Sequence, residues 1–302
     1  MTTFLTRLGR GGAWRAERAF AASSRQTRRA TSSLRSRPTF LLLGAQKAGT
    51  TSLHQHLRDH PAVLTATVKE VQYFNKEYHR GDRWYLSHFP LRTHTTAVRG
   101  RRATAQVGEA TAAYLFDPRV PVRVHAFDSG MRLVAVLRDP VERAYSHHQM
   151  EIRWRRELLP FPEALRREEV ELPLELERIA VDPLRPSGLG CAYVARGRYA
   201  EQLERWLALF PREQLLVLFA EELVTDPRGQ LTLLADFLEL PPFGEDPLPH
   251  RGAQRYDPMD PPVRERLAEL FEPENRRLAA LLGRTLPWPS SERTAAAARS
   301  FA

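Results

Sequence analysis

The feature that most constrains the fold is a short, almost wholly apolar run at residues 39–44 that leads into a turn and then a helix. Its sequence is TFLLLG, and a continuous apolar run bounded by a turn is typical of a buried strand in a parallel sheet. The turn AQKAG is followed by Thr50, Thr51 and Ser52, and then by Leu53 and Leu57 at helical spacing. The sequence therefore predicts a strand, a loop and a helix in immediate succession.

The same alternation of strands and helices continues along the chain. We expect further strands at 131–137 and 215–219, and helices at 141–153, 197–210, 226–238 and 261–283. Strands that alternate with helices favour a parallel sheet with crossover helices. We therefore predict a single α/β domain with a central parallel β-sheet over residues 38–288, with a long loop at 241–262.

Composition removes several classes of protein. The chain has 302 residues and one cysteine, Cys191, which excludes a disulfide framework and a zinc site built from several thiolates. No apolar stretch approaches the ~18 residues that a membrane-spanning helix needs. The net charge of +9 is concentrated in residues 1–37, so the rest of the chain holds 36 basic and 35 acidic residues. A nearly neutral body argues against a nucleic-acid partner, and we expect a cytoplasmic protein.

Both ends of the chain are expected to be disordered tails. Residues 1–37 contain nine arginines and one acid and are rich in Ser, Ala and Thr. That composition fits an organellar transit peptide, a basic binding arm, or a leader with no targeting function, and the sequence leaves all three open. Residues 289–302 are expected to form the second tail.

The turn at 44–52 has the composition of an anion-binding loop. A helix N-terminus presents free backbone N–H groups and the positive end of the helix dipole, both of which favour a bound phosphate. Thr50, Thr51 and Ser52 add hydroxyl groups and Lys47 adds a positive charge. Lys47 precedes Gly49, whereas a nucleoside-triphosphate P-loop places its lysine after the second glycine. A phosphate site of another kind is therefore predicted, with a plain strand-to-helix turn as the alternative.

A second candidate site follows the strand at 131–137. Ligands of open α/β sheets bind at the carboxyl ends of the strands, and arginine is suited to bidentate phosphate recognition. Arg138 stands at such a strand end and Ser146 follows in the next helix. The alternative is a surface ion pair between Arg138 and Asp139 or Glu142.

Five segments resemble, in order along residues 38–288, the sulfotransferases that use 3′-phosphoadenosine 5′-phosphosulfate. The resemblance is strongest to their heparan-sulfate-type branch and its bacterial relatives. The segments are FLLLGAQKAGTTSLHQHL, KEVQYFNKEYHRGDRWYLSHFP, RLVAVLRDPVERAYSHHQ, RGRYAEQLERWLALFPREQLLVLFAEEL with its TDP continuation, and RYDPMDPPVRERLAELFEPENRRLAALLG.

This resemblance implies a donor site. It places Lys47, Ala48, Gly49, Thr50, Thr51 and Ser52 on the 5′-phosphate of the donor, and Arg138 and Ser146 on its 3′-phosphate. A family loop over the nucleotide matches 250–260, where Arg255 or Arg251 supplies the charge that relatives carry in a Lys-Gly-Arg run; a Pro-rich connector is the alternative. No metal is required by this scheme.

The resemblance also implies the catalytic residues. Sulfuryl transfer to an alcohol needs a base near the acceptor oxygen and positive charge near the leaving phosphate. Lys69 and Glu70 match that pattern, with Glu70 as the base and Lys69 assisting Lys47; a surface ion pair is the alternative. The family often reads KEPHFF here, so Val71 and Gln72 depart from it, and Gln72 cannot take a proton.

Lysine is rare in this chain: it has only three, against 42 arginines. Lysine is a compact point charge and arginine a wide fork, so a retained lysine is a candidate for a place where arginine fails. The function predicted from these residues is sulfuryl transfer to a hydroxyl or amine of a small-molecule or glycan acceptor. A nucleotide-dependent kinase and a non-catalytic polyanion-binding protein are the alternatives.

Overall fold

The computed structural model describes residues 26–92, 105–186, 189–244 and 256–289. They form a five-stranded, all-parallel sheet in the order β2-β3-β1-β4-β5, which confirms the predicted α/β fold. The strands are β1 (Phe40–Gly44), β2 (Val63–Thr65), β3 (Gln106–Ala110), β4 (Arg132–Leu137) and β5 (Leu215–Phe219).

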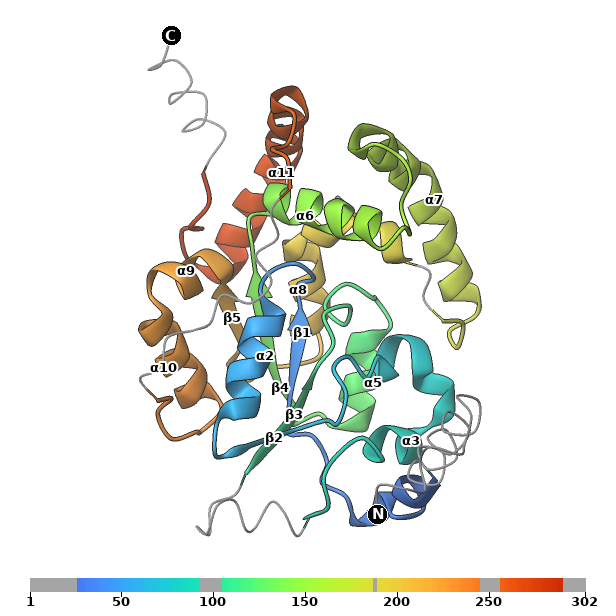
Figure 1. Cartoon of the computed structure of the whole chain (residues 1–302), viewed down its shortest axis with the longest axis vertical. Helices are drawn as coiled ribbons and strands as arrows, with labels where there is room; N and C mark the ends of the chain where they lie inside the picture. Colours follow the sequence, from blue (N-terminus) through green and yellow to red (C-terminus); the bar gives the residue numbers. More distant parts are fainter. Residues whose placement is uncertain (1–25, 93–104, 187–188, 245–255, 290–302) are drawn as a thin grey trace, which may run out of the picture.

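Helices cover both faces of the sheet, with α2 and α10 on one side and α5 on the other (Figure 1). The helices are α2 (Thr50–Asp59), α3 (Asp82–Leu86), α5 (Val120–Phe127), α6 (Pro140–Arg153), α7 (Phe161–Val181), α8 (Tyr199–Leu207), α9 (Ala220–Thr225), α10 (Pro227–Phe237) and α11 (Pro261–Leu282). Short helical turns are η1 (Ser32–Leu34), η2 (Tyr73–Glu77), η3 (Tyr78–Arg80), η5 (Leu189–Cys191), η6 (Ala195–Gly197) and η7 (Arg212–Gln214). Because both faces of the sheet are covered, Leu41, Leu42 and Leu43 of β1 are all buried, which is why this strand reads as a continuous apolar run.

The order of the strands creates a crevice between β1 and β4. From β1 the chain passes through α2 to β2 on one side, whereas from β4 it passes through α6, α7 and α8 to β5 on the other side. The loops that follow these two neighbouring strands therefore turn in opposite directions. In open parallel sheets, ligands bind in the crevice at this point.

Two Asp-Pro pairs begin helices, one directly after β4 and one directly after α9. Asp139 accepts a hydrogen bond from the backbone N–H of Val141 (2.8 Å) and so caps α6, and Pro140 opens the helix. Asp226 accepts a hydrogen bond from Gly229 (3.0 Å) and caps α10 in the same way. An Asp cap satisfies an otherwise free N–H, and proline fits the first helical position, so the RDP and TDP segments fix where these helices start.

Part of the segment that was expected to form a disordered tail is ordered. Residues 26–37 pack on the domain, with Ser32 2% and Arg35 7% exposed. Arg28 donates to the carbonyl oxygen of Ser87 (2.7 Å), and Arg35 donates to that of Phe89 (2.8 Å). The arginines that indicated a solvated tail here bind backbone carbonyls. The rest of that predicted tail, residues 1–25, lies outside the described residues, as does 290–302 of the C-terminal one.

The predicted strands and helices are present, but β2, β3, α3, α5, α7 and α9 were not predicted from the sequence. β2 is only three residues long, and α7 contains Pro173. In the described part of the chain, no helix is long and apolar enough to span a membrane.

Candidate active site

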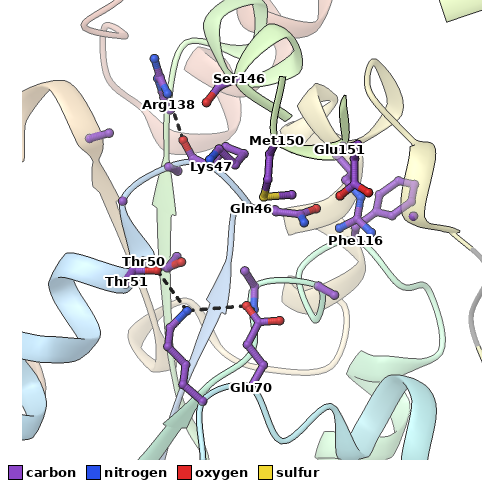
Figure 2. Close-up of a pocket in the computed structure, with 18 of the residues that line it drawn as sticks. Gln46, Lys47, Thr50, Thr51, Glu70, Phe116, Arg138, Ser146, Met150 and Glu151 are labelled. Carbon is purple, nitrogen blue, oxygen red and sulfur yellow. Dashed lines mark hydrogen bonds and ion pairs between the residues drawn. The ribbon is translucent and has the colours of Figure 1, made fainter. Parts of the chain in front are cut away.

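A cavity of about 1210 Å³ lies against the segments that follow β1 and β4. Figure 2 shows the loop after β1, the segment around Glu70 and helix α6 converging on it. Every predicted site residue that the structure describes lines this cavity: Lys47, Ala48, Gly49, Thr50, Thr51, Ser52, Lys69, Glu70, Arg138 and Ser146. Arg255 lies outside the described residues. The fold therefore brings together side chains that are up to about a hundred residues apart in the chain.

The loop after β1 is a tight turn with a specific backbone. Gly44 has φ 150°, and a Cβ there would lie 2.8 Å from the carbonyl oxygen of Ala112, so only glycine fits. Lys47 (φ 72°) and Gly49 (φ 91°) are in the left-handed region, and Gly49 stands at the N-cap of α2. This turn presents the first residues of α2, from Thr50 to Ser52, to the cavity, where their amides and the helix dipole favour an anion.

Lys47 lies among other positive charges. Burial lowers the pKa of the Lys47 ammonium, and nearby Arg138 and Arg153 lower it further, whereas Glu151 raises it. Like charges that lie close together at the wall of a cavity repel one another, and a bound anion would relieve that repulsion.

Arg138 is held in place from both sides. Its Nη1 donates to the carbonyl oxygen of Lys47 (3.2 Å), and its own carbonyl oxygen accepts from the Tyr199 hydroxyl (2.8 Å). Its Nη2 lies 4.0 Å from Glu142, which is more closely paired with Arg264 at 2.5 Å. Arg138 thus keeps donors available to the cavity, and Figure 2 shows its side chain near that of Ser146.

Lys69 and Glu70 form an ion pair at the cavity wall. The Lys69 ammonium lies 3.6 Å from the Glu70 carboxylate and donates to the Thr51 hydroxyl (3.3 Å), which links the pair to α2 (Figure 2). Glu70 also accepts from the backbone N–H of Ala112 (3.3 Å). The pair is a surface feature only in part, because the two side chains are 23% and 29% exposed.

The cavity extends beyond these residues, and the sequence did not predict its other end. That end is lined by Gln46, Asn75, Lys76, Phe116, Met150, Glu151, Trp154, Arg156 and Arg196. Burial and Arg143 lower the pKa of Arg196 to about 10, and burial raises the pKa of Glu151. One signal in the sequence points here: all three lysines of the chain line this one cavity.

Metal ligands do not come together in the parts of the chain that the structure describes, where no group of three His, Cys, Asp or Glu residues could hold an ion.

The fold and the cavity define an α/β protein with a candidate anion-binding site at the carboxyl edge of a parallel sheet. A family model described as the sulfotransferase domain matches residues 37–250. The chain therefore belongs to the sulfotransferase family. This membership confirms the resemblance seen in the sequence.

Individual relatives agree with this membership. A sulfotransferase from Alicyclobacillus acidocaldarius is 32% identical, with a TM-score of 0.62 over 83% of this chain and 98% of that one. The human bifunctional heparan sulfate N-deacetylase/N-sulfotransferase 3 is 31% identical over 83% of this chain. The human heparan sulfate glucosamine 3-O-sulfotransferase 5 is 28% identical, covering 83% of this chain and 74% of that protein. The chain spans only 31% of the length of the bifunctional enzyme.

Proposed function

We propose that this chain transfers a sulfuryl group from 3′-phosphoadenosine 5′-phosphosulfate to a hydroxyl or amine of an acceptor, which is a carbohydrate or a glycosylated metabolite. The observation that carries this proposal is the convergence of three segments on one cavity. The N-terminus of α2 with Lys47, the pair Arg138 and Ser146, and the pair Lys69 and Glu70 all line it.

The donor has two phosphate groups, and the cavity offers two sets of groups for them. The amides and hydroxyls of residues 48–52 fit the 5′-phosphate, because a helix N-terminus stabilises an anion. Arg138 and Ser146 fit the 3′-phosphate, which distinguishes this donor from ordinary adenine nucleotides. Arg138 is tied to the carbonyl oxygen of Lys47, so the two phosphate sites are held in a fixed relation.

The transfer step needs a proton acceptor on one side of the sulfur and positive charge on the other. Glu70 takes the proton of the acceptor hydroxyl while the oxygen of that hydroxyl forms a bond to sulfur. The bond between sulfur and the 5′-phosphate oxygen breaks, and adenosine 3′,5′-bisphosphate leaves with the electron pair. Lys47, assisted by Lys69, stabilises the charge that grows on this phosphate.

The acceptor class is supported by the relatives. Two of them are named for sulfation of heparan sulfate, one at nitrogen and one at a glucosamine hydroxyl. The unpredicted end of the cavity, around Glu151 and Arg196, adds polar and charged groups of both signs next to Phe116 and Trp154. Such a mixture suits a polar acceptor with an apolar face.

The experiment uses the full chain, the donor and a small-molecule and glycan extract, with mass spectrometry to find products that have gained one sulfuryl group. Glu70→Gln should slow transfer by on the order of 10²–10⁴-fold and leave the affinity for adenosine 3′,5′-bisphosphate unchanged. Glu77→Gln is the matched control, because Glu77 is on the same segment, pairs with Arg80 and does not line the cavity. Normal turnover in Glu70→Gln would remove Glu70 from the mechanism, and no sulfated product would overturn the proposed function.

A further inference from the structure

A carboxylate lies buried beneath the cavity without lining it. Glu109, on β3, is 1% exposed and is the acceptor of three side-chain hydroxyls. Tyr85 and Tyr114 both donate to its Oε1 at 2.9 Å, and Thr111 donates to its Oε2 at 2.9 Å. A buried charge is costly unless it is hydrogen-bonded, and Glu109 satisfies this condition through hydroxyls on two different segments, α3 and residues 111–114.

Two of those hydroxyls also hold the segment that carries Glu70. The Thr111 hydroxyl accepts from the backbone N–H of Gln72 (3.3 Å), and the Tyr114 hydroxyl accepts from that of Phe74 (3.3 Å). Each hydroxyl thus donates to Glu109 and accepts from the 70–74 segment. Glu109 fixes the direction in which both hydroxyl protons point, and so leaves their lone pairs for the backbone.

The same arrangement contacts Glu70 itself. Ala112, which follows Thr111, donates its backbone N–H to the Glu70 carboxylate (3.3 Å). On the other segment, Gln72 is in the left-handed region at φ 56°, a conformation that is uncommon for a residue with a side chain. The backbone N–H of this residue is the one from which the Thr111 hydroxyl accepts, and that hydroxyl in turn donates to Glu109.

Aromatic packing supports the arrangement but does not replace it. Tyr73 stacks on Tyr85 with ring centroids 4.5 Å apart, and Phe74 meets Tyr114 edge to face at 5.5 Å. These contacts hold the rings without orienting the hydroxyl protons. Only an acceptor at the position of Glu109 does so, and a carboxylate accepts more hydrogen bonds than the amide of glutamine.

We propose that Glu109 is a positioning residue for Glu70: through Thr111 and Tyr114 it holds the 70–74 segment against residues 111–114, and so aims the Glu70 carboxylate into the cavity. This inference rests on the proposed function of Glu70 as the base. Displacing a catalytic group by about an ångström costs on the order of 100-fold in rate, so loss of Glu109 should slow transfer without touching the donor.

The first test is a double-mutant cycle on single-turnover transfer from 3′-phosphoadenosine 5′-phosphosulfate. Glu109→Gln should lower the rate per folded site by about 10-fold to 100-fold. In a Glu70→Gln background the same change should have less than about a twofold effect, because a residue that acts through Glu70 has nothing left to position. Folded sites are counted by titration with adenosine 3′,5′-bisphosphate, whose affinity should not change.

Milder variants keep the test decisive if Glu109→Gln does not fold. Tyr114→Phe and Thr111→Val each remove one hydroxyl and should slow transfer in the same direction. Tyr193→Phe is the matched control: its hydroxyl is equally buried and donates to another buried carboxylate, Glu157, also at 2.9 Å, but that pair does not touch the 70–74 segment. Tyr193→Phe should lower the free energy of unfolding about as much as Tyr114→Phe does, and it should leave the rate of transfer per folded site unchanged.

Hydrogen exchange gives a readout that needs no acceptor. In Thr111→Val and Tyr114→Phe, the peptide covering residues 69–75 should exchange faster than in the parent, whereas in Tyr193→Phe it should not. Full additivity in the cycle, or equal rates in Tyr114→Phe and the parent, would overturn the inference and leave the proposed function standing. A parent chain that neither binds adenosine 3′,5′-bisphosphate nor consumes the donor would overturn both.

Discussion

Replacement of Lys47 probes the electrostatics of the donor site more sharply than any other single change. Lys47 is half-buried, and burial together with Arg138 and Arg153 lowers the pKa of its ammonium, so the free enzyme holds this charge at a cost. An anionic phosphate would offset that cost. We therefore expect Lys47→Ala to weaken both donor binding and turnover.

The magnitude follows from the contact that is lost. A hydrogen bond to a charged group contributes about 1.5–3 kcal/mol, so the affinity for adenosine 3′,5′-bisphosphate should fall by about 10-fold to 150-fold. Turnover should fall by about a further tenfold, because more charge collects on the leaving phosphate in the transition state than in the ground state. Backbone strain does not differ among the parent, Lys47→Ala and Lys47→Arg, because Lys, Ala and Arg are equally disfavoured at the φ of 72° found here.

Lys47→Arg tests whether the site needs a compact charge. Lysine presents a compact ammonium, whereas arginine presents a wider planar guanidinium that cannot take the same position against a phosphate. We expect partial rescue, with affinity restored to within about tenfold of the parent and turnover restored less. Calorimetry with adenosine 3′,5′-bisphosphate and single-turnover transfer measure the two quantities. Unchanged affinity in Lys47→Ala would refute the placement of this ammonium on the phosphate, and full activity in Lys47→Arg would refute the compact-charge argument.

Three further predictions concern metal, stability and pH. Chelators should leave transfer intact and ATP with Mg²⁺ should not support it, which a donor-consumption assay checks; a requirement for a divalent ion would contradict the mechanism. Arg35→Ala should lower the free energy of unfolding by about 2–3 kcal/mol, because it removes hydrogen bonds to the carbonyl oxygens of Phe89 and Arg28. Arg166→Ala, which removes only an exposed ion pair, should change it by less than about 0.5 kcal/mol. A denaturant titration measures both. Burial raises the pKa of Glu109 from 4.5 to about 7, so the folded chain holds this proton more tightly than the unfolded chain. The resulting stabilisation of the parent is complete below about pH 4.5 and is lost as the pH rises through about 7. The difference in free energy of unfolding between Glu109→Gln and the parent should therefore shift by up to about 3 kcal/mol in favour of the variant over that window. A difference that does not change with pH would contradict the raised pKa.

That the proposed donor-binding residues meet at one cavity could be predicted from the sequence, because they lie in contiguous segments with clear local signals. Lys47 to Ser52 follow an apolar strand directly, and Arg138 stands at the end of another. Parallel strands end at the same edge of a sheet, so two such segments meet once β1 and β4 are neighbours.

The rest could not be predicted, because it depends on packing between distant segments. Glu109 is one acid in a short strand, and only the fold places it against hydroxyls from α3 and from residues 111–114. Arg196 and Glu151 reach the cavity from η6 and α6, with no local motif to mark them. At the N-terminus, arginine content indicated a solvated tail, but Arg28 and Arg35 use their guanidinium groups to bind loop carbonyls instead.

The central claim is that the cavity recognises a nucleotide with both a 5′-phosphate and a 3′-phosphate. The most direct measurement is calorimetry of the full chain with adenosine 3′,5′-bisphosphate and with AMP. Because Arg138 and Ser146 would bind only the 3′-phosphate, the bisphosphate should bind at least about tenfold more tightly, and Arg138→Ala should remove most of that difference. Equal affinities of the parent chain for the two nucleotides would contradict the claim.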